Sequence, residues 1–164
     1  MEGMFEKAKK NLMIALKFFE KEYHPYLIKT LFNLSHVMCK ANELEKGEFY
    51  YEKGFELALN TDNSEYIAKF NLLRGLYLNQ DCFDLIDTAF DFLESNEMYG
   101  DIDEFAFEVG EVLLKRGEVA RSSKYYQKVV MAKKQIQKGE MINETQIDNL
   151  LISHTSGGGV FSNN

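Results

Sequence analysis

Apolar residues recur along the chain at the spacing of one face of a helix. The three clearest segments are residues 27–40, 66–78 and 104–117. In the first, Leu31, Leu34 and Met38 follow one another at i, i+3 and i+7. This spacing forms one apolar stripe along an α-helix and does not fit the two-residue period of a strand. The pattern therefore predicts three amphipathic helices.

A second set of segments shows the same arrangement of small and bulky residues. These segments are residues 5–18, 44–57 and 119–132. Each has a small residue, namely Ala8, Gly47 or Ser122, with a bulky residue four positions later. Ala8 and Gly47 are 39 positions apart. A weaker copy around Ile86 lies a further 39 positions on, and Ser122 follows 36 positions after it. A period of this length is typical of a repeat protein.

Each segment of the second set, except the first, follows a helix of the first set after a short turn. A small residue where two helices cross lets their backbones approach, and stacked hairpins bury the apolar faces that one hairpin leaves open. We therefore predict an all-α fold of stacked helical hairpins. The tyrosine pairs 50–51 and 125–126 are then core and inter-repeat packing residues, with a ligand contact as the alternative.

The repeat pattern also predicts the domain organisation. We expect one repeat domain over residues 1–144 that starts in the middle of a repeat, because the helix over 5–18 has no partner before it. Pro25 should end this helix. Residues 145–164 form a C-terminal extension that either lengthens the last helix or caps it, and that is largely flexible from about residue 155.

Charge is unevenly distributed along this acidic chain. The formal net charge of -7 argues against nucleic-acid binding, which requires a basic surface. No Lys or Arg lies between Gly75 and Leu114, a stretch with eleven acidic residues, whereas Lys115–Lys138 has eight basic residues and one acidic residue. The two stretches are either solvated helix faces of opposite sign or an acidic patch that receives a basic partner.

The sequence offers no pattern that points to catalysis, a metal or a cofactor. Cys39 and Cys82 stand alone, and the histidines at 24, 36 and 154 have no ligand spacing around them. No apolar run approaches the roughly 20 residues that span a bilayer. We expect a cytoplasmic protein that is not an enzyme, has no cofactor and does not associate with membranes.

The repeats resemble the tetratricopeptide repeat, stretched from its usual length of about 34 residues to 36–39 residues. The stretch Met98–Glu144, which has "QIQKGE" near its end, is similar to the C-terminal region of the Rap, NprR and PlcR group of bacterial cell–cell signalling receptors. This resemblance covers roughly residues 5–144. It implies hairpins stacked in a right-handed superhelix whose concave groove binds a short signalling peptide.

The resemblance also implies what the chain does not do. Rap proteins carry an N-terminal bundle that engages a response regulator, in some members as an aspartyl-phosphate phosphatase, and NprR and PlcR relatives carry a DNA-binding module there. Neither module is recognisable in this sequence, so phosphatase activity is not expected. The alternative function is a scaffold or antagonist that binds a response regulator or a related receptor without a peptide ligand.

The first helix of each hairpin should line the groove, and the predicted peptide-binding residues lie on these helices: Lys29, Asn33, His36, Asn71, Arg74, Glu104, Phe107 and Glu108. The resemblance points to Asn33 and Asn71 as partners of the peptide backbone, since an amide both donates and accepts hydrogen bonds. The alternative is that both are exposed residues without a role. The two "FNL" motifs that contain them are 38 positions apart, not 39, so they need not face the same way.

Two further expectations concern charged and apolar surfaces. Arg74 either holds a carboxylate of the peptide or pairs with Glu65 or Asp81. The acidic residues of 104–111 suit an amine or a basic side chain. The helix over 5–18 has apolar residues without a partner helix, and we expect self-association through it: Phe5, Leu12, Ile14, Leu16 and Phe18.

Overall fold

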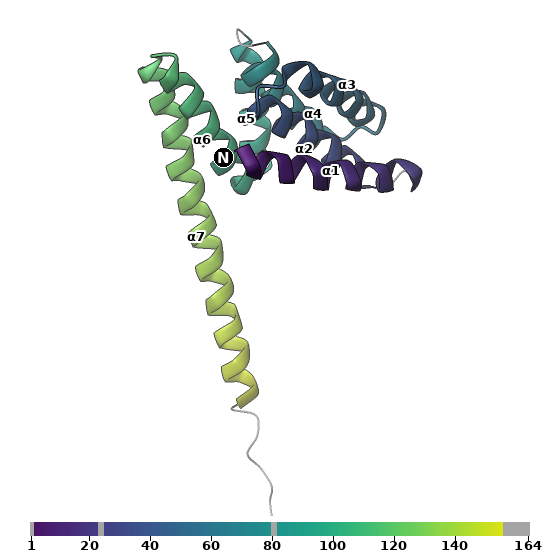
Figure 1. Ribbon diagram of the computed structural model, residues 1–164. Helices are drawn as coiled ribbons and strands as arrows, with labels where there is room; N and C mark the ends of the chain where they lie inside the picture. The colour runs from purple at the N-terminus through teal and green to yellow at the C-terminus, as the bar shows by residue number, and fades with distance from the viewer. Residues whose placement is uncertain (1, 23–24, 80–81, 156–164) are drawn as a thin grey trace, which may run out of the picture. The chain divides into compact units, whose positions relative to one another are not determined.

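The computed structural model describes residues 2–22, 25–79 and 82–155 (Figure 1). All regular secondary structure in these ranges is helical. The elements are α1 (Glu2–Glu22), α2 (Leu27–Lys40), α3 (Leu44–Asn60), α4 (Ser64–Leu73), the π-helical turn η1 (Arg74–Leu78), α5 (Phe83–Ser95), α6 (Tyr99–Lys115) and α7 (Val119–Thr155). The predicted all-α fold is confirmed.

The helices pair as the repeat pattern predicts. The hairpins are α2 with α3, α4 and η1 with α5, and α6 with α7, while α1 packs on α2. The chain forms two compact units, residues 1–98 and 99–164. The first unit contains α1 and two hairpins, and the second contains the hairpin of α6 and α7. None of the helices in the described residues is long and apolar enough to cross a membrane.

The core of the first unit has an aliphatic and an aromatic part. Leu16 of α1 packs with Leu31, Leu34 and Met38 of α2. Phe70 of α4 is fully buried, and its ring centroid lies 5.3 Å from Phe32 and 5.5 Å from Tyr51, edge to face in both pairs. Tyr51 and Tyr125 are both buried, which confirms the packing role predicted for these two residues.

Close helix approach depends on the small residues that define the repeat. A Cβ added to Gly47 would lie 2.5 Å from Cys39 Sγ, so only glycine fits against α2 there. The Ser35 hydroxyl donates a 2.7 Å hydrogen bond to the Gly47 carbonyl across the same contact. In the next hairpin, the glycine is on the first helix, since a Cβ at Gly75 would meet Ile86 Cγ1 at 2.6 Å.

Four helices end in the same way. The second residue after each helix end adopts a positive φ, at Asn42, Asp62, Glu97 and Gly117. The following backbone N–H then returns to a carbonyl five residues earlier, as in the bonds Glu43 to Met38 and Glu118 to Leu113, both 2.9 Å. This pattern is the Schellman motif, which satisfies carbonyls left open at a helix end. It gives sharp turns both within and between hairpins.

The second unit is built on the buried stripe of α6. Phe105, Ala106, Val109 and Leu113 all lie on this stripe. The Ser122 hydroxyl of α7 donates a 2.9 Å hydrogen bond to the Gly110 carbonyl of α6. Helix α7 continues for 37 residues, so the stretch 145–154 extends the last helix. Residues 156–164, where we expect a flexible tail, lie outside the described residues.

Helix α1 is only partly open on its apolar side. Leu16 is buried and Leu12 is partly buried against the core, in contrast to the expectation that both lack a partner. The reason is that α2 and α3 cover these positions. Met4, Ile14 and Phe18 remain exposed, at 78%, 61% and 57% of their surface.

Candidate functional site

The predicted groove residues of α2 differ in their surroundings. Lys29 is exposed and Asn33 is partly buried. His36 is only 8% exposed, because its ring packs 5.9 Å from Phe32 and 6.2 Å from Tyr77 (centroid distances). His36 is therefore a packed residue at the contact between α2 and the π-helical turn η1.

Aromatic rings join the first helices of the two hairpins in the first unit. Phe32 of α2 lies 5.9 Å from Tyr66 of α4, edge to face. Together with the His36–Tyr77 contact, this makes a row of rings along the α2–α4 contact, which we call the aromatic row: Phe32, His36, Tyr66 and Tyr77. Tyr66 and Tyr77 are partly accessible, so the row offers stacking surface to a ligand.

The two "FNL" motifs do not lead to equivalent contacts. His36 lies four residues after Phe32, and Arg74 lies four residues after Phe70. His36 packs toward Tyr77 of the following hairpin, whereas the Arg74 guanidinium lies 5.8 Å from the ring centroid of Tyr51, in the preceding hairpin. Arg74 is also the first residue of η1, where the helix widens by one residue per turn. Asn71 is partly buried just before this change.

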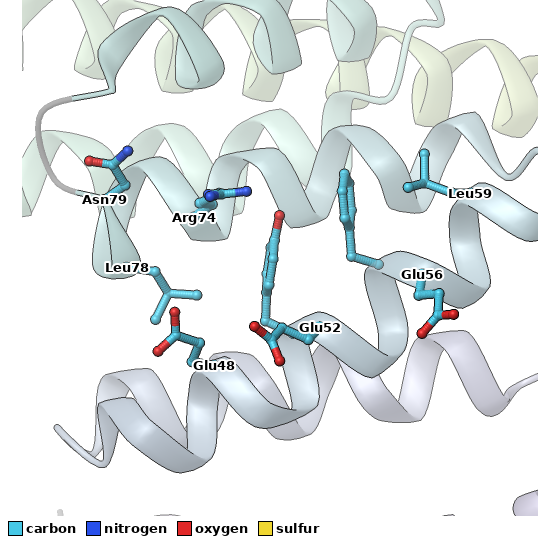
Figure 2. A pocket seen from close by; sticks show the side chains of 9 residues that line it. Glu48, Glu52, Glu56, Leu59, Arg74, Leu78 and Asn79 are labelled. Carbon is cyan, nitrogen blue, oxygen red and sulfur yellow. The ribbon is translucent and has the colours of Figure 1, made fainter.

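A pocket of about 620 Å³ lies between α3 and the end of α4 with η1. Figure 2 shows Arg74 and Asn79 extending from one side, and Glu48, Glu52 and Glu56 from α3 on the other. The apolar part of the lining consists of Tyr51, Phe55, Leu59 and Leu78. This volume is within the range of about 300–1,000 Å³ that is common for small-ligand sites.

The hydroxyl of Tyr51 is the unusual polar group of this pocket. The residue is 4% exposed, and its hydroxyl is buried beside the Arg74 side chain. Burial raises the pKa of Tyr51, while the hydrogen bond with Arg74 and the positive charge of Arg74 oppose part of that rise. The hydroxyl is therefore protonated at neutral pH and can both donate and accept a hydrogen bond.

One ion pair considered for Arg74 is occupied by another residue. Glu65 pairs with Lys69 at 2.7 Å, one helical turn away on α4. The Lys69 side chain is largely buried and its ammonium also lies 5.2 Å from the Tyr66 ring centroid. Asp81, the other acid considered for Arg74, lies outside the described residues.

The predicted site residues of α6 belong to the second unit. Glu104 is exposed, Phe107 is 53% exposed, and Glu108 is 8% exposed. The Phe107 ring lies 6.0 Å from that of Tyr126 in α7. The Tyr126 hydroxyl donates a 2.6 Å hydrogen bond to Glu111, and this bond raises the pKa of Tyr126. Glu104 and Phe107 are thus accessible, while Glu108 is a buried polar residue.

The sequence reasoning missed the pocket residues on α3. Glu48, Glu52 and Glu56 lie four positions apart, which places their carboxylates on one helix face, and this signal was available in the sequence. Tyr51 was predicted as a packing residue, with a ligand contact as the alternative. No group of three or more His, Cys, Asp or Glu side chains among the described residues is placed to hold a metal ion.

Comparison with known proteins places this architecture among bacterial regulators. No protein-family model matches the chain. The chain is 37% identical over 146 residues to response regulator aspartate phosphatase I of Bacillus subtilis (strain 168), a match that covers 89% of this chain and 37% of that protein. The crystal structure of the apo form of RapI has a TM-score of 0.78 and 36% identity, over 82% of this chain and 49% of that chain.

This chain is a homologue of the Rap proteins. A second structure, the Rap conjugation gene regulator of plasmid pLS20 in complex with the Phr* peptide, has a TM-score of 0.64 and 30% identity. It covers 77% of this chain and 36% of that chain. The resemblance to Rap-type regulators and the tetratricopeptide-like fold are therefore confirmed. The chain spans a little over a third of the length of response regulator aspartate phosphatase I.

Proposed function

We propose that this chain is a peptide-binding repeat module of a Rap-type signalling regulator. The observation that carries the proposal is its similarity to the pLS20 Rap regulator, which is described in complex with the Phr* peptide, at 30% identity and a TM-score of 0.64. The ligand that we propose is a short signalling peptide.

The α2–α4 surface of the first unit is the proposed location of the peptide. Asn33 and Asn71 are partly buried residues at matching places in the two "FNL" motifs, and their side-chain amides can pair with the N–H and C=O of an extended peptide. The aromatic row supplies apolar surface beside them. Lys29 contributes an exposed positive charge on α2. In the second unit, taken by itself, Glu104 and Phe107 of α6 are the predicted contacts that are accessible.

The proposal is tested by calorimetric titration of the chain with pools of five- to seven-residue peptides. We expect saturable binding that Asn33→Ala and Asn71→Ala each weaken by about tenfold, the effect of losing one or two backbone hydrogen bonds that the bound state needs. Asn60→Ala, at the exposed end of α3, is the matched control. Absence of binding at high micromolar concentrations, or equal effects of all three substitutions, would contradict the proposal.

A second candidate function is binding of a protein partner through charged surfaces. The observation that favours it is the basic stretch Lys115–Lys138, most of which lies in the first half of α7 and which follows the acidic sequence of α5 and α6 along the chain. The related aspartate phosphatase is named for a response regulator, and a response regulator or a related receptor is the corresponding partner here. Pull-down of such a protein at low salt, lost at about 0.5 M salt where screening is strong, would support this function.

We also propose that the chain acts by binding rather than by catalysis, in the cytoplasm. The proposal of a binding role rests on the similarity to the pLS20 Rap regulator, which is described in complex with a peptide. Incubation of the chain with a phosphorylated response regulator tests it directly. Phosphate release at the spontaneous rate is expected, and acceleration by the chain would overturn the non-enzymatic role.

Self-association through α1 is a further part of the proposal. It is supported by the exposed Met4, Ile14 and Phe18 on this helix. We expect a concentration-dependent dimer in sedimentation equilibrium that Ile14→Glu and Phe18→Glu disrupt. A monomer at all concentrations would contradict it.

A further inference from the structure

The hairpin of α6 and α7 leaves one of its sides open to solvent. The residues on this side recur at i, i+3, i+7 and i+10 in α6 and at i, i+4, i+7 and i+11 in α7, so each row forms one stripe along its helix. The Tyr126 side chain joins the two stripes, since its ring lies 6.0 Å from that of Phe107 and its hydroxyl donates to Glu111. We call this surface the hairpin face: Glu104, Phe107, Glu111 and Leu114 of α6, with Val119, Ser123, Tyr126 and Val130 of α7.

Much of the hairpin face is both apolar and exposed. Phe107 and Val130 are each 53% exposed, and Leu114 and Val119 are 47% and 63% exposed. Beside Phe107 lies a hollow of about 420 Å³ that is lined by five α7 residues: Ser123, Tyr126, Gln127, Val130 and Met131. The face therefore carries a projecting aromatic ring and, next to it, an open hollow with largely apolar walls.

The antiparallel register of the hairpin fixes the levels of these groups along the helices. Asp103 pairs with Lys133 at 3.6 Å, and the Gly110 carbonyl accepts a hydrogen bond from Ser122 at 2.9 Å. Phe107 lies between these two contacts, so it is level with the middle of the hollow. Charge is divided between the helices. Helix α6 has five acidic residues and one basic residue, whereas residues 119–138 of α7 have six basic residues and no acidic residue.

We propose that the hairpin face packs against the same face of a second copy of this chain. A two-fold axis parallel to the helices lays α6 of each copy on α7 of the other at the same level, which gives a four-helix bundle. Phe107 of each copy then fills the hollow of the other. Glu104 of each copy, one residue after Asp103, comes within reach of Lys134 of the other, one residue after Lys133.

The division of charge selects this arrangement over its alternative. A two-fold axis across the helices would lay α6 on α6 and α7 on α7, so that acidic residues would face acidic residues and basic residues would face basic ones. Like charges brought together in an interface are costly. With the axis along the helices, each acidic helix meets a basic one.

The size of the hairpin face limits the strength of this dimer. Helix α6 has 17 residues, so the face is about 25 Å long and, at two helix diameters, about 20 Å wide. The contact therefore covers about 500 Å² on each copy, which is at the low end for specific interfaces. We expect a weak dimer with a Kd of about 10–100 μM.

Sedimentation equilibrium of the full chain tests the dimer. The chain should carry Ile14→Glu and Phe18→Glu, which remove the association proposed for α1 and leave the hairpin face intact. In this background we expect a monomer–dimer equilibrium that weakens at about 0.5 M salt, where charge pairs are screened. Phe107→Glu and Ser123→Arg, which remove the projecting ring and block the hollow, should each weaken the dimer by at least about tenfold.

A charge exchange shows whether the contact joins two chains. Glu104→Lys and Lys134→Glu should each weaken the homodimer by about tenfold, because both copies of the charge pair become repulsive. An equimolar mixture of these two variants should dimerise as well as the background chain, since both pairs are then attractive again. Glu45→Lys, an exposed residue of the first unit, is the matched control and should have no effect.

Two results would overturn the proposal. One is a monomer up to about 500 μM in the Ile14→Glu and Phe18→Glu background. The other is a dimer that Phe107→Glu and Ser123→Arg leave unchanged and that the charge exchange does not restore. A peptide that contacts Phe107 would compete with this dimer, whereas Asn33 and Asn71 lie in the first unit. The peptide titration with the two asparagine variants is therefore decided separately.

Discussion

The hairpin of α2 and α3 and the hairpin of α6 and α7 solve the same packing problem with exchanged residues. In the first, Ser35 on the first helix donates to the carbonyl of Gly47 on the second helix, at 2.7 Å. In the last, Ser122 on the second helix donates to the carbonyl of Gly110 on the first helix, at 2.9 Å. Ser35 and Gly110 are 75 positions apart, and so are Gly47 and Ser122. The serine and the glycine have therefore changed places between the two hairpins.

The comparison shows that the pair matters more than the position of either residue. One helix must lack a Cβ so that the backbones can approach, and the other supplies a hydroxyl small enough to reach the exposed side of a carbonyl. The space around the glycine at the helix crossing differs between the two hairpins. A Cβ at Gly47 would lie 2.5 Å from Cys39 Sγ, whereas one at Gly110 would lie 3.0 Å from the Tyr126 ring. The first hairpin is therefore the tighter of the two.

The largest expected effect is at Gly54, a second glycine that the first hairpin has and the last replaces with Val129. A Cβ there would lie 2.3 Å from Phe70 Cζ and 3.0 Å from Leu31 Cβ. Gly54→Ala should lower the free energy of unfolding by about 2 kcal/mol, because overpacking outweighs the better helix propensity of alanine. Urea unfolding measures this. Gly139→Ala, with open space around it, is the control and should be neutral or stabilising.

A smaller effect tests the difference in clearance directly. Gly47→Ala should cost about 1–2 kcal/mol of unfolding free energy, and Gly110→Ala less than about 1 kcal/mol, since the Tyr126 ring can shift and the backbone around Cys39 cannot. Urea unfolding of both variants shows which substitution lowers the free energy of unfolding more. Equal costs, or a larger cost at Gly110, would show that the two hairpins are equally tight.

The serine substitutions should have similar effects in both hairpins. Ser35→Ala and Ser122→Ala each remove one buried hydrogen bond to a carbonyl and should each cost about 1 kcal/mol. Chemical denaturation followed by circular dichroism measures the free energy of unfolding of both variants. Costs that differ by more than about 1 kcal/mol would mean that the two contacts are not equivalent.

The smallest effects distinguish the two hairpins by pH. Lys46 and Lys9 lower the pKa of Glu43, which precedes α3, so the stability from this group is present above its ordinary pKa and is lost as the pH falls through the lowered value. In the last hairpin, the bond to Glu111 raises the pKa of Tyr126, so that stability is present below its ordinary pKa and is lost as the pH rises through the raised value.

Two variants check this contrast in thermal unfolding across pH. Glu43→Gln should flatten the acid side of the Tm profile, and Tyr126→Phe should flatten the alkaline side above about pH 10. Each variant should leave the opposite side of the profile unchanged. If either variant changed both sides alike, the assignment of the titrating groups would be wrong.

The sequence predicted the hairpins because the small residues at the helix crossings recur at a regular spacing. Gly47, Ser122 and the apolar stripe of α2 give the period and the pairing of helices without any knowledge of the fold. The Ser35 and Gly110 partners were not predicted, since a serine in a helix has the same local pattern whether it meets solvent or another helix.

The site was less predictable than the fold. The π-helical turn begins at Arg74, where Gly75 packs closely against Ile86 in a tertiary contact that no local pattern reports. Its trace in the sequence is the 38-residue spacing of the two "FNL" motifs. At this turn the contacts of the two motifs diverge, since His36 packs against the following hairpin and Arg74 against the preceding one. The pocket around Tyr51 requires two helices from different hairpins, so no single segment predicts it.

The most direct test of the peptide-binding account is a nuclear magnetic resonance titration of the isotope-labelled chain with a peptide that binds in the calorimetric screen. The side-chain amide signals of Asn33 and Asn71 report on the proposed surface without any substitution. The account predicts that both shift together and saturate at one peptide per chain. Saturable shifts confined to α1, or to the basic half of α7, with both asparagine signals unmoved, would contradict it.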